Sequence, residues 1–350
     1  MSHSISRREF IRRGSALAAA VGIVGPLAAC SGGSSSESGP SNATINVQLK
    51  WLKNAESAGF WIADDAGYYR DQTLTPNFIA GGPNIATTTP IVAGGRADIA
   101  EEQLLTVVDA ISQGEDFVVI GTVFQSNPLG ILSLPKAPVL TARDLVGKRV
   151  GMQQGAKEQV DALLKVNGLE TNYEVVPVGF DPAPLVEGAC DAYTCFVTNQ
   201  AVALEQKGVA HIATTFGAMG LPSYSDVLFA KRSWLNQNRD AVVRWLRGSI
   251  KGWERNVQDP ALGARLSVQK YGLSLGLQQD QQELQNKMQV SLIQSDLTRE
   301  KGLLYVSKEE LAGPIYKGFE AAGRANLPSP DQVIDTSFLA EAYGGKKSLL

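Results

Sequence analysis

Histidine is scarce in this chain: the 350 residues include two, His3 and His211. A metal site built from several histidines is therefore excluded. A Ser/His/Asp triad would have to use His211, which stands in AHIATTF, a strand-like run with no nucleophile elbow nearby. The sequence thus offers no histidine-based catalytic site.

Cysteine is also rare, with Cys190 and Cys195 the only two after the N-terminal segment. They stand five positions apart on a segment predicted to be extended, which puts them on opposite faces and prevents a mutual disulfide without a kink. We interpret them as small buried hydrophobic residues, with a redox pair as the alternative. No GxGxxG or GxxxxGK[ST] phosphate loop occurs either. The residues therefore do not indicate a catalyst.

Positive charge is limited once the N-terminal segment is set aside. The chain has 32 Lys+Arg and 35 Asp+Glu, and removing the four arginines and one glutamate of residues 1–29 leaves 28 against 34, a net charge of −6. A nucleic-acid-binding protein needs a basic patch or stripe, so we expect no nucleic-acid partner. No hydrophobic run after residue 29 is long enough to span a membrane.

The first 43 residues have the composition of an export signal and a tether. Residues 1–29 carry Arg7-Arg8, then an apolar run of about 14 residues that is too short for a bilayer span. Arg7-Arg8 resembles a twin-arginine signal, and LAAC, ending at Cys30, resembles a bacterial lipobox; a buried N-terminal helix is the alternative. Residues 30–43 are Ser/Gly-rich and predict a flexible tether. We expect a lipid on Cys30 to anchor the protein to the extracytoplasmic face of the cell membrane.

The remaining residues alternate between strand and helix patterns. In TINVQLKWL, apolar and polar residues alternate, which predicts a strand with one buried face that ends at Trp51. A helix with Ser57 as its cap follows. Further strands are expected near 75–79, 97–100, 117–124, 148–152, 173–178 and 190–196, and helices near 84–94, 103–113, 156–167, after Asp181, from about 199, and almost throughout from Trp234.

Strands that alternate with helices indicate βαβ units and mostly parallel sheets. We therefore predict a two-lobed α/β protein, with lobe I formed by residues 44–136 and 224–350 and lobe II by residues 137–223.

Five stretches carry a resemblance to a known family: LKWLKNAESAGFWIADDAGYYRDQTLTPNF, GGPNIATTTPIVAGGRADIA, LTARDLVGKRVGM, VGFDPAPLVEGACDAYTCFVTNQ and DVLFAKRSWL. Together they resemble substrate-binding proteins of ABC importers that include the thiamine-pyrimidine-precursor, riboflavin, alkanesulfonate and nitrate binders. The resemblance implies a type II periplasmic-binding-protein fold whose two lobes close on a small ligand. It also implies a monomer that needs no cofactor and delivers its ligand to ABC permease subunits.

In open α/β sheets, ligands bind beyond the carboxyl ends of the strands, which selects four stretches. The first runs from Trp51 through Asn54 to Ser57, where the indole of Trp51 can stack on a flat ring or pack in the core. The second is Gly81-Gly82-Pro83-Asn84, whose glycines are expected to expose backbone N–H groups at a helix start, with a tight turn as the alternative. The third is Gln153-Gln154-Gly155. The fourth is Thr198-Asn199-Gln200, after a strand that ends at Phe196; the vitamin binders of the family commonly carry Asn-Glu here, so Gln200 weakens the case for a carboxylate at this point.

Other polar and aromatic residues are expected near the same cleft. Glu101 and Glu102 follow a predicted strand and can supply negative charge, with a solvated pair as the alternative. Phe124-Gln125 and Tyr224-Ser225 flank the predicted hinge. The predicted ligand-binding positions are Trp51, Asn54, Ser57, Gly82, Asn84, Glu102, Gln125, Gln154, Phe196, Asn199, Gln200 and Tyr224.

One relative in this family is an enzyme, the eukaryotic thiamine pyrimidine synthase, which consumes its own histidine and a bound pyridoxal phosphate. The resemblance places its cofactor lysine at Glu102, its histidine at Thr106, and its cysteine cluster at residues 222–225, which are Pro-Ser-Tyr-Ser. None of these groups is present. We therefore predict a binding protein, not an enzyme.

The candidate loops suit a flat heteroaromatic ring better than an anion. A sulfonate or nitrate ligand requires arginine or several aimed N–H groups, whereas these loops contain only Lys53 and Lys157. Aromatic residues near amides suit a thiamine pyrimidine precursor or a riboflavin-like vitamin. Between those two vitamins the sequence leaves the choice open, and an alkanesulfonate, taurine or nitrate binder is the alternative.

Overall fold

The computed structural model describes residues 42–82, 84–153 and 156–350. The predicted signal peptide, Cys30 and the tether up to residue 41 lie outside the described residues. Within the described part of the chain, no helix is long and apolar enough to cross a membrane.

The first sheet has five strands in the order β2-β1-β3-β10-β4. Parallel pairing joins β1 to both β2 and β3, whereas β10 runs antiparallel to both β3 and β4. Its strands are β1 (Ala43–Gln48), β2 (Leu74–Ile79), β3 (Ile99–Glu102), β4 (Phe117–Phe124) and β10 (Ser225–Lys231). We call this sheet and its helices lobe I.

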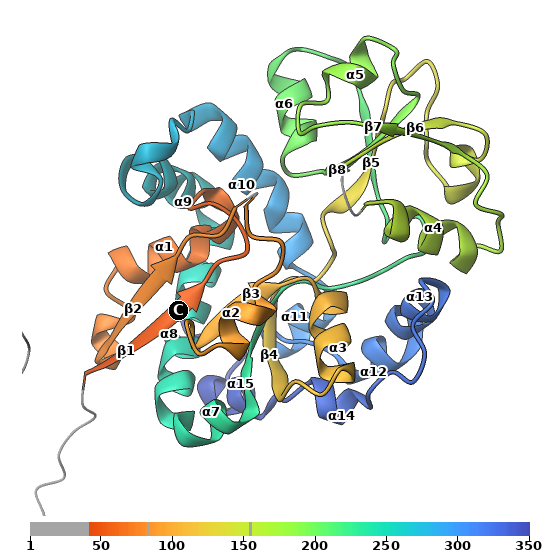
Figure 1. The fold of residues 1–350 in the computed structure, drawn as a ribbon. Coiled ribbons are helices and arrows are strands. Elements are labelled where there is room, and N and C mark those ends of the chain that lie inside the picture. Colours follow the sequence, from red (N-terminus) through yellow and green to blue (C-terminus); the bar gives the residue numbers. More distant parts are fainter. Residues whose placement is uncertain (1–41, 83, 154–155) are drawn as a thin grey trace, which may run out of the picture. The chain divides into compact units, whose positions relative to one another are not determined.

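The second sheet repeats the same plan in the order β7-β6-β8-β5-β9. Parallel pairing joins β6 to β7 and β8, whereas β5 runs antiparallel to β8 and β9. Its strands are β5 (Leu129–Ser133), β6 (Arg149–Met152), β7 (Glu174–Pro177), β8 (Ala192–Phe196) and β9 (Ile212–Thr215). We call this sheet and its helices lobe II. The predicted α/β architecture with two mostly parallel sheets is confirmed (Figure 1).

Helices flank both sheets. Those of the first βαβ series are α1 (Ala58–Asp65), α2 (Thr89–Ala93) and α3 (Leu104–Ser112), and those of lobe II are α4 (Ala156–Val166), α5 (Ala183–Val186) and α6 (Gln200–Gln206). The C-terminal part is almost all helical, as predicted, with α7 (Arg232–Gln237), α8 (Arg239–Gln258), α9 (Pro260–Leu266), α10 (Gln279–Ile293), α11 (Asp296–Lys301), α12 (Lys308–Glu310), α13 (Tyr316–Ala321), α14 (Pro330–Val333) and α15 (Ser337–Tyr343).

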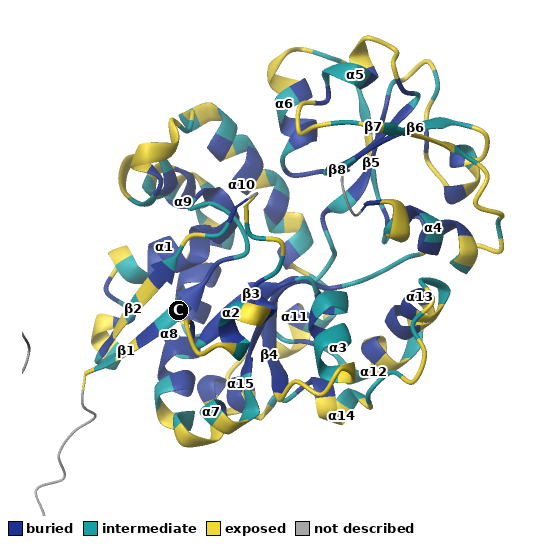
Figure 2. Ribbon diagram, in the orientation of Figure 1, coloured by how far each residue is buried: buried dark blue, intermediate teal, exposed yellow. Residues whose placement is uncertain are grey.

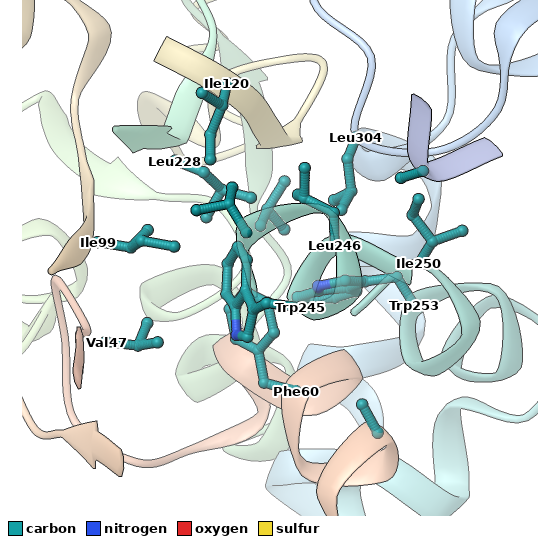
Figure 3. Close-up of a cluster of buried hydrophobic side chains, with 14 of the residues drawn as sticks. Val47, Phe60, Ile99, Ile120, Leu228, Trp245, Leu246, Ile250, Trp253 and Leu304 are labelled. Carbon is teal, nitrogen blue, oxygen red and sulfur yellow. The ribbon is translucent and has the colours of Figure 1, made fainter. Parts of the chain in front are cut away.

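The first sheet is buried on both faces because alternate residues of its strands enter two different cores. In β10, Leu228 packs in the same cluster as Trp245 and Trp253, whereas Val227 and Phe229 pack in the opposite cluster with α3. Figure 3 shows the first core, and the central strand β3 and the strand β4 of this sheet are buried throughout, dark blue in Figure 2. A sheet covered on both faces matches the predicted βαβ arrangement.

Helices α1 and α8 approach closely in the first core because glycines face each other. A Cβ on Gly252 would lie 2.1 Å from the carbonyl oxygen of Gly59, and a Cβ on Gly59 would lie 2.1 Å from the Trp253 ring. Any side chain at either position would therefore separate the two helices.

Three predicted boundaries differ in the structure. Strand β1 ends at Gln48 rather than at Trp51, and the predicted helix over 84–94 begins at Thr89. The second sheet begins before residue 137, the predicted lobe boundary, because β5 pairs with β8 and β9. The period-2 pattern continues past the end of β1, and apolar alternation does not reveal where hydrogen-bonded pairing stops.

The chain passes between the two sheets twice. Residues 125–128 lead from β4 into β5, and residues 216–224 lead from β9 back to β10. A backbone hydrogen bond of 3.0 Å from Asn127 N–H to the Ser223 carbonyl joins these two connections. The carboxyl ends of the parallel strands in both sheets therefore lie close to a shared pair of connections.

Candidate functional site

Aromatic residues of the two lobes meet beyond the end of β1. The Trp51 ring stacks on the Phe180 ring of lobe II, with centroids 5.7 Å apart and planes inclined by 11°. The neighbouring Lys50 places its Nζ 4.6 Å from the centroid of Phe196, at the end of β8. The loop after β1 is therefore the part of lobe I that faces the loops after β7 and β8.

The Trp51–Phe180 stack forms one wall of an open hollow that both lobes line. We call it the aromatic hollow, and its lining residues are Trp51, Leu52, Asn54, Phe180, Asn199, Leu277, Gln281, Gln282 and Gln285. Indole and phenyl faces lie beside amide groups from Asn199 and from helix α10. Such a surface suits a flat ring that carries hydrogen-bonding groups at its edge.

A cluster of buried charges lies immediately behind Lys50. Its Nζ is 2.5 Å from Asp226 Oδ1 and 3.5 Å from Glu56 Oε1. Asp226 is completely buried, and its second oxygen, Oδ2, has no hydrogen-bond partner within the described structure. Glu101 belongs to the same group and is also buried, 2 % exposed. We call Lys50, Glu56, Glu101 and Asp226 the charge cluster.

The charge cluster contains three carboxyl groups and a single ammonium group, so proton uptake is favoured. Burial raises the pKa of Glu56 to about 7, although the Lys50 charge opposes the shift. Burial also raises the pKa of Glu101 well above its usual range, and the Asp226 charge adds to the rise. Burial alone would lower the pKa of Lys50, but Asp226 and Glu56 outweigh it and the pKa is raised. The ammonium of Lys50 therefore stays protonated.

The loop after β1 is held in place by hydrogen bonds between side chains and backbone groups. Asn54 caps a short 3₁₀ turn by accepting a 2.9 Å hydrogen bond from Glu56 N–H, and its carbonyl accepts one from Trp61 Nε1. Gln282 of α10 accepts a 2.8 Å hydrogen bond from Ala55 N–H. Glu56 is thereby fixed beside Lys50 by neighbours that belong to other elements of lobe I.

Three predicted site residues meet in the aromatic hollow. Trp51, Asn54 and Asn199 all line it, and Phe196 lies nearby under Lys50. Trp51 is half-buried and belongs to none of the hydrophobic cores, so the alternative of plain core packing does not describe it. Ser57 is buried at the start of α1 without a capping hydrogen bond from its side chain.

The predicted exposure of backbone N–H groups at the Gly-Gly turn is wrong. Gly81 N–H donates to the Trp51 carbonyl at 2.8 Å, and Gly82 N–H points to the Lys50 carbonyl at 3.4 Å. A Cβ on Gly81 would lie 2.3 Å from that Lys50 oxygen. These glycines thus allow the turn to pack against the loop after β1. Asn84 is exposed and precedes the start of α2 by several residues.

The predicted hinge residues point to the C-terminal part of lobe I. The Tyr224 hydroxyl donates to Glu310 Oε2 at 2.6 Å, and its ring is fully buried in the core. Gln125 donates to the Tyr305 carbonyl at 2.7 Å and accepts from the Ser295 hydroxyl. Both side chains are occupied by structural hydrogen bonds.

Polar side chains predicted at two other strand ends are also engaged. Gln200 is buried and accepts a 2.9 Å hydrogen bond from Phe196 N–H, and Gln153 donates to the Thr194 carbonyl at 3.0 Å. Gln154 lies outside the described residues, as do Pro83 and Gly155.

Glu101 and Glu102 are buried, so the alternative of a solvated pair is wrong. Glu102 accepts hydrogen bonds from Thr88 N–H at 2.6 Å and from Gln103 N–H at 2.9 Å. Its carboxylate therefore fixes the turn before α2, and the Lys50 charge acts on both glutamates.

Sequence reasoning missed Lys50, Glu56, Asp226 and Phe180. The period-2 pattern places Lys50 on the polar face of its strand, and the candidate loops themselves contain only Lys53 and Lys157. The available signal was an aspartate at the head of the otherwise apolar strand DVLFA, since an isolated buried carboxylate needs a partner. Asp226 also has φ of 51°, an uncommon backbone conformation for a residue other than glycine.

A second cavity lies beside the two connections, lined by α3, α4, α13 and residues 216–223. Thr106, Pro222 and Ser223 line it. These are positions at which the resemblance places the histidine and cysteines of the synthase. The cavity thus contains hydroxyl groups where that enzyme has reactive side chains.

Among the described residues, no cluster of histidine, cysteine and carboxylate side chains could hold a metal ion. Cys190 and Cys195 are both free and buried, which confirms their interpretation as small hydrophobic residues. They pack in one and the same hydrophobic cluster, so the predicted opposite faces are wrong. Cys190 precedes β8, and the strand alternation does not extend to it.

Comparisons with known proteins agree with this architecture. The 4-amino-5-hydroxymethyl-2-methylpyrimidine phosphate synthase of Legionella pneumophila is 25% identical over 222 residues, covering 62% of this chain and 70% of that protein. The formylaminopyrimidine-binding protein of Halalkalibacterium halodurans is 24% identical over 225 residues, covering 62% of this chain and 67% of that protein.

Among solved structures, the periplasmic aliphatic sulphonate binding protein SsuA from Escherichia coli superposes with a TM-score of 0.64 at 14% identity, covering 87% of this chain and 99% of that chain. The two chains share the two-lobed periplasmic-binding-protein fold. The family model described as NMT1/THI5 like matches residues 54–262. The chain therefore belongs to the NMT1/THI5-like family.

Proposed function

We propose that this protein is an extracytoplasmic solute-binding protein of an ABC importer, and that it captures a small flat heteroaromatic molecule between its lobes. The observation that carries the proposal is the aromatic hollow, where Trp51 of lobe I meets Phe180 of lobe II beside the amide of Asn199. A ring that enters there contacts both lobes, so binding favours the closed arrangement.

The charge cluster favours a ligand with amino groups over an anion. With all groups ionised, one ammonium and three carboxylates give a net charge of −2, and proton uptake by Glu56 and Glu101 brings it toward zero. A sulfonate or nitrate would therefore find no net positive charge around Lys50 to balance its own charge. An aminopyrimidine edge can donate hydrogen bonds to carboxylates. The relative named as a formylaminopyrimidine-binding protein supports this class of ligand.

The residues favour binding without turnover. A lysine that forms a Schiff base must lose its proton, whereas the Lys50 ammonium is stabilised by Asp226 and Glu56. Burial raises the pKa of Cys195 above its usual range, which suppresses the reactive thiolate. The synthase relative of Legionella pneumophila makes the enzymatic alternative worth testing directly.

We further propose that a lipid on Cys30 anchors the monomer at the outer face of the cell membrane and that permease subunits receive the ligand. The twin-arginine and lipobox patterns of residues 1–30 support the anchor. The tether then gives the folded part room to reach a permease.

Mass spectrometry of ligand released from the purified protein tests the proposal. We expect a pyrimidine or a related heterocycle, bound one to one and returned unchanged. Calorimetric titration with aminopyrimidines, riboflavin and alkanesulfonates then ranks the classes. Tight binding of a sulfonate but of no heterocycle would contradict the ligand assignment, and conversion of a pyrimidine precursor would contradict the binding-protein assignment.

A further inference from the structure

Two helices of the C-terminal part of lobe I reach lobe II. Met288 and Leu292 of α10 pack against the hydrophobic cluster of lobe II that contains Leu132 and Tyr193. On another side, α13 packs against α4. The contact of α10 is apolar, whereas the contact of α13 ends in a charged side chain.

A kink sends α13 toward lobe II. The helical run that begins with α12 is interrupted at Gly313, with φ of −98° and ψ of −105°, directly before Pro314. Proline removes a backbone donor and sterically disfavours the preceding helical turn, so a change of direction is expected here. After the kink, Tyr316 and Phe319 remain in the core of lobe I.

The centre of α13 rests on the second connection between the sheets. A Cβ on Gly318 would lie 2.5 Å from Leu221 Cδ1, so the Leu221 side chain packs closely on the backbone of the helix at this glycine. Leu221 itself packs against the hydrophobic cluster of lobe II that surrounds α4. Helix α13 is thereby in contact with both lobes at one point.

Arg324, just after α13, extends this contact by pairing with one carboxylate in each lobe. Its Nε lies 3.0 Å from Asp109 Oδ1 and its Nη2 lies 2.6 Å from Asp109 Oδ2, on α3 of lobe I. Its Nη1 forms an ion pair with Glu158, on the first turn of α4 in lobe II. Arg324 also lines the second cavity, together with Phe216, Leu221 and Phe319.

We propose that Arg324 is an inter-lobe clasp, a positioning residue that holds lobe II against lobe I in the closed arrangement. The Arg324–Asp109 ion pair stays intact when the lobes separate, because both residues belong to lobe I. The Arg324–Glu158 ion pair breaks, because Glu158 belongs to lobe II. Ligand release from the proposed site, on whose existence this consequence rests, then requires rupture of the Arg324–Glu158 ion pair.

The size of the effect follows from the exposure of the pair. The Arg324 and Glu158 side chains are 26% and 47% exposed, so water and salt screen their attraction. Measured pairs of this kind shift an equilibrium by roughly 1.5- to 5-fold. The ion pair thus shifts the equilibrium between open and closed arrangements toward the closed one, but it does not prevent opening.

Distances between spin labels on the two lobes test the clasp without any ligand. Asp71 in lobe I and Lys136 in lobe II are exposed label sites, to be changed to cysteine in a Cys30→Ser background, where Cys190 and Cys195 are buried. We expect Glu158→Gln to lower the closed-to-open ratio by about 1.5- to 5-fold, and Glu158→Lys to lower it further by repulsion. Both variants keep the Arg324–Asp109 ion pair, so the melting temperature should stay nearly constant.

Arg239→Gln is the matched control, because it removes an exposed Arg–Glu341 pair that lies entirely within lobe I. Added salt should open the wild-type protein but leave the Glu158→Gln distances unchanged. Equal distance distributions for wild type and both Glu158 variants would overturn the clasp. Since no ligand is present, this result is independent of whether the proposed heterocycle binds.

Discussion

Lys50 Nζ and Asp226 Oδ1 lie 2.5 Å apart, in a pair that joins the loop after β1 to the head of β10. Asp226 is completely buried, and the Lys50 side chain is 16% exposed. The Lys50 end of the pair is thus partly exposed beside the Phe196 ring, whereas the Asp226 end lies in the interior of lobe I. Removing Asp226 leaves Lys50 with only Glu56, at 3.5 Å, and removing Lys50 leaves the buried Asp226 without its cationic partner.

Asp226→Asn should destabilise the protein by about 3 kcal/mol, because neutralising one partner of a buried ion pair leaves the Lys50 ammonium with only the more distant Glu56 carboxyl group beside it. Urea unfolding at pH 7 measures the loss. Asp116→Asn is the control, since Asp116 lies 4.0 Å from Arg232 and is 53% exposed; its change should stay within about 0.5 kcal/mol. Equal stability of Asp226→Asn and wild type would show that the ion pair contributes nothing.

Stability should fall as the pH rises from about 4.5 to about 7. Burial raises the pKa of Glu56 to about 7, and a carboxyl group whose pKa is raised on folding contributes stability below its unfolded pKa that is lost as the pH passes the folded value. The expected loss is on the order of 2–3 kcal/mol. Urea unfolding at several pH values measures it.

Glu56→Gln should flatten this pH profile, whereas Glu115→Gln, at an exposed position, should leave it unchanged. Glu101, whose pKa burial also raises, accounts for any slope of the same sign that remains in Glu56→Gln. A profile that rises with pH in the wild-type protein would contradict the protonation of the charge cluster.

Gly252→Ala should destabilise the core of lobe I by about 2–3 kcal/mol, since inserting a methyl group into a filled space costs about that much. The new Cβ would lie 2.1 Å from the Gly59 carbonyl oxygen, which forces α1 and α8 apart. Gly179→Ala is the control, because a Cβ there meets nothing within 4 Å. Thermal unfolding of the two variants distinguishes a tight helix contact from a general effect of alanine.

The sequence pattern predicts the fold because burial periodicity is a local property. In β4 and β10, alternate residues point to two separate cores, so both strands stand out in the sequence as short, nearly continuous apolar runs. Sheet order and crossovers repeat from one lobe to the other, as the resemblance implies.

The candidate site is harder to predict because its groups come from distant parts of the chain. The role of Asp226 depends on its contacts with Lys50 and Glu56, which belong to the loop after β1. The predicted amide of Gln200 turns back to the end of its own strand, and that of Gln153 bonds to the Thr194 carbonyl of the neighbouring strand β8. Whether a polar side chain is free to face a ligand thus depends on which nearby backbone groups lack a hydrogen-bond partner. Residue type alone does not reveal this.

Cys30→Ala should release the protein from the membrane fraction if a lipid on this residue is the anchor. The lipobox reading rests on residues 27–30, Leu-Ala-Ala-Cys, and the described residues contain no helix that could span a membrane. Fractionation followed by immunodetection measures the distribution. A companion change of Arg7 and Arg8 to lysine tests the export route. Membrane retention of Cys30→Ala would contradict the lipoprotein assignment.

Trp51→Ala should weaken ligand binding far more than it weakens the fold. Loss of the indole removes a stacking surface worth roughly 0.5–1.5 kcal/mol beyond area burial, and about 1.5–3 kcal/mol of buried contact. The expected loss of about 2–4 kcal/mol corresponds to roughly 30- to 1000-fold in Kd. Because Trp51 is half-buried and outside the hydrophobic cores, its removal should change the melting temperature little.

Leu140→Ala provides the control for this variant, because Leu140 is a large apolar residue of lobe II that is 56% exposed and does not line the aromatic hollow. Asn199→Ala should cost less than Trp51→Ala, about 1–3 kcal/mol, since it leaves one polar group of the ligand unpaired. Calorimetric titration of each folded variant with the ligand identified by mass spectrometry measures the differences. An unchanged affinity in Trp51→Ala would remove the Trp51–Phe180 wall from the binding site, and the second cavity would then become the place to seek the ligand.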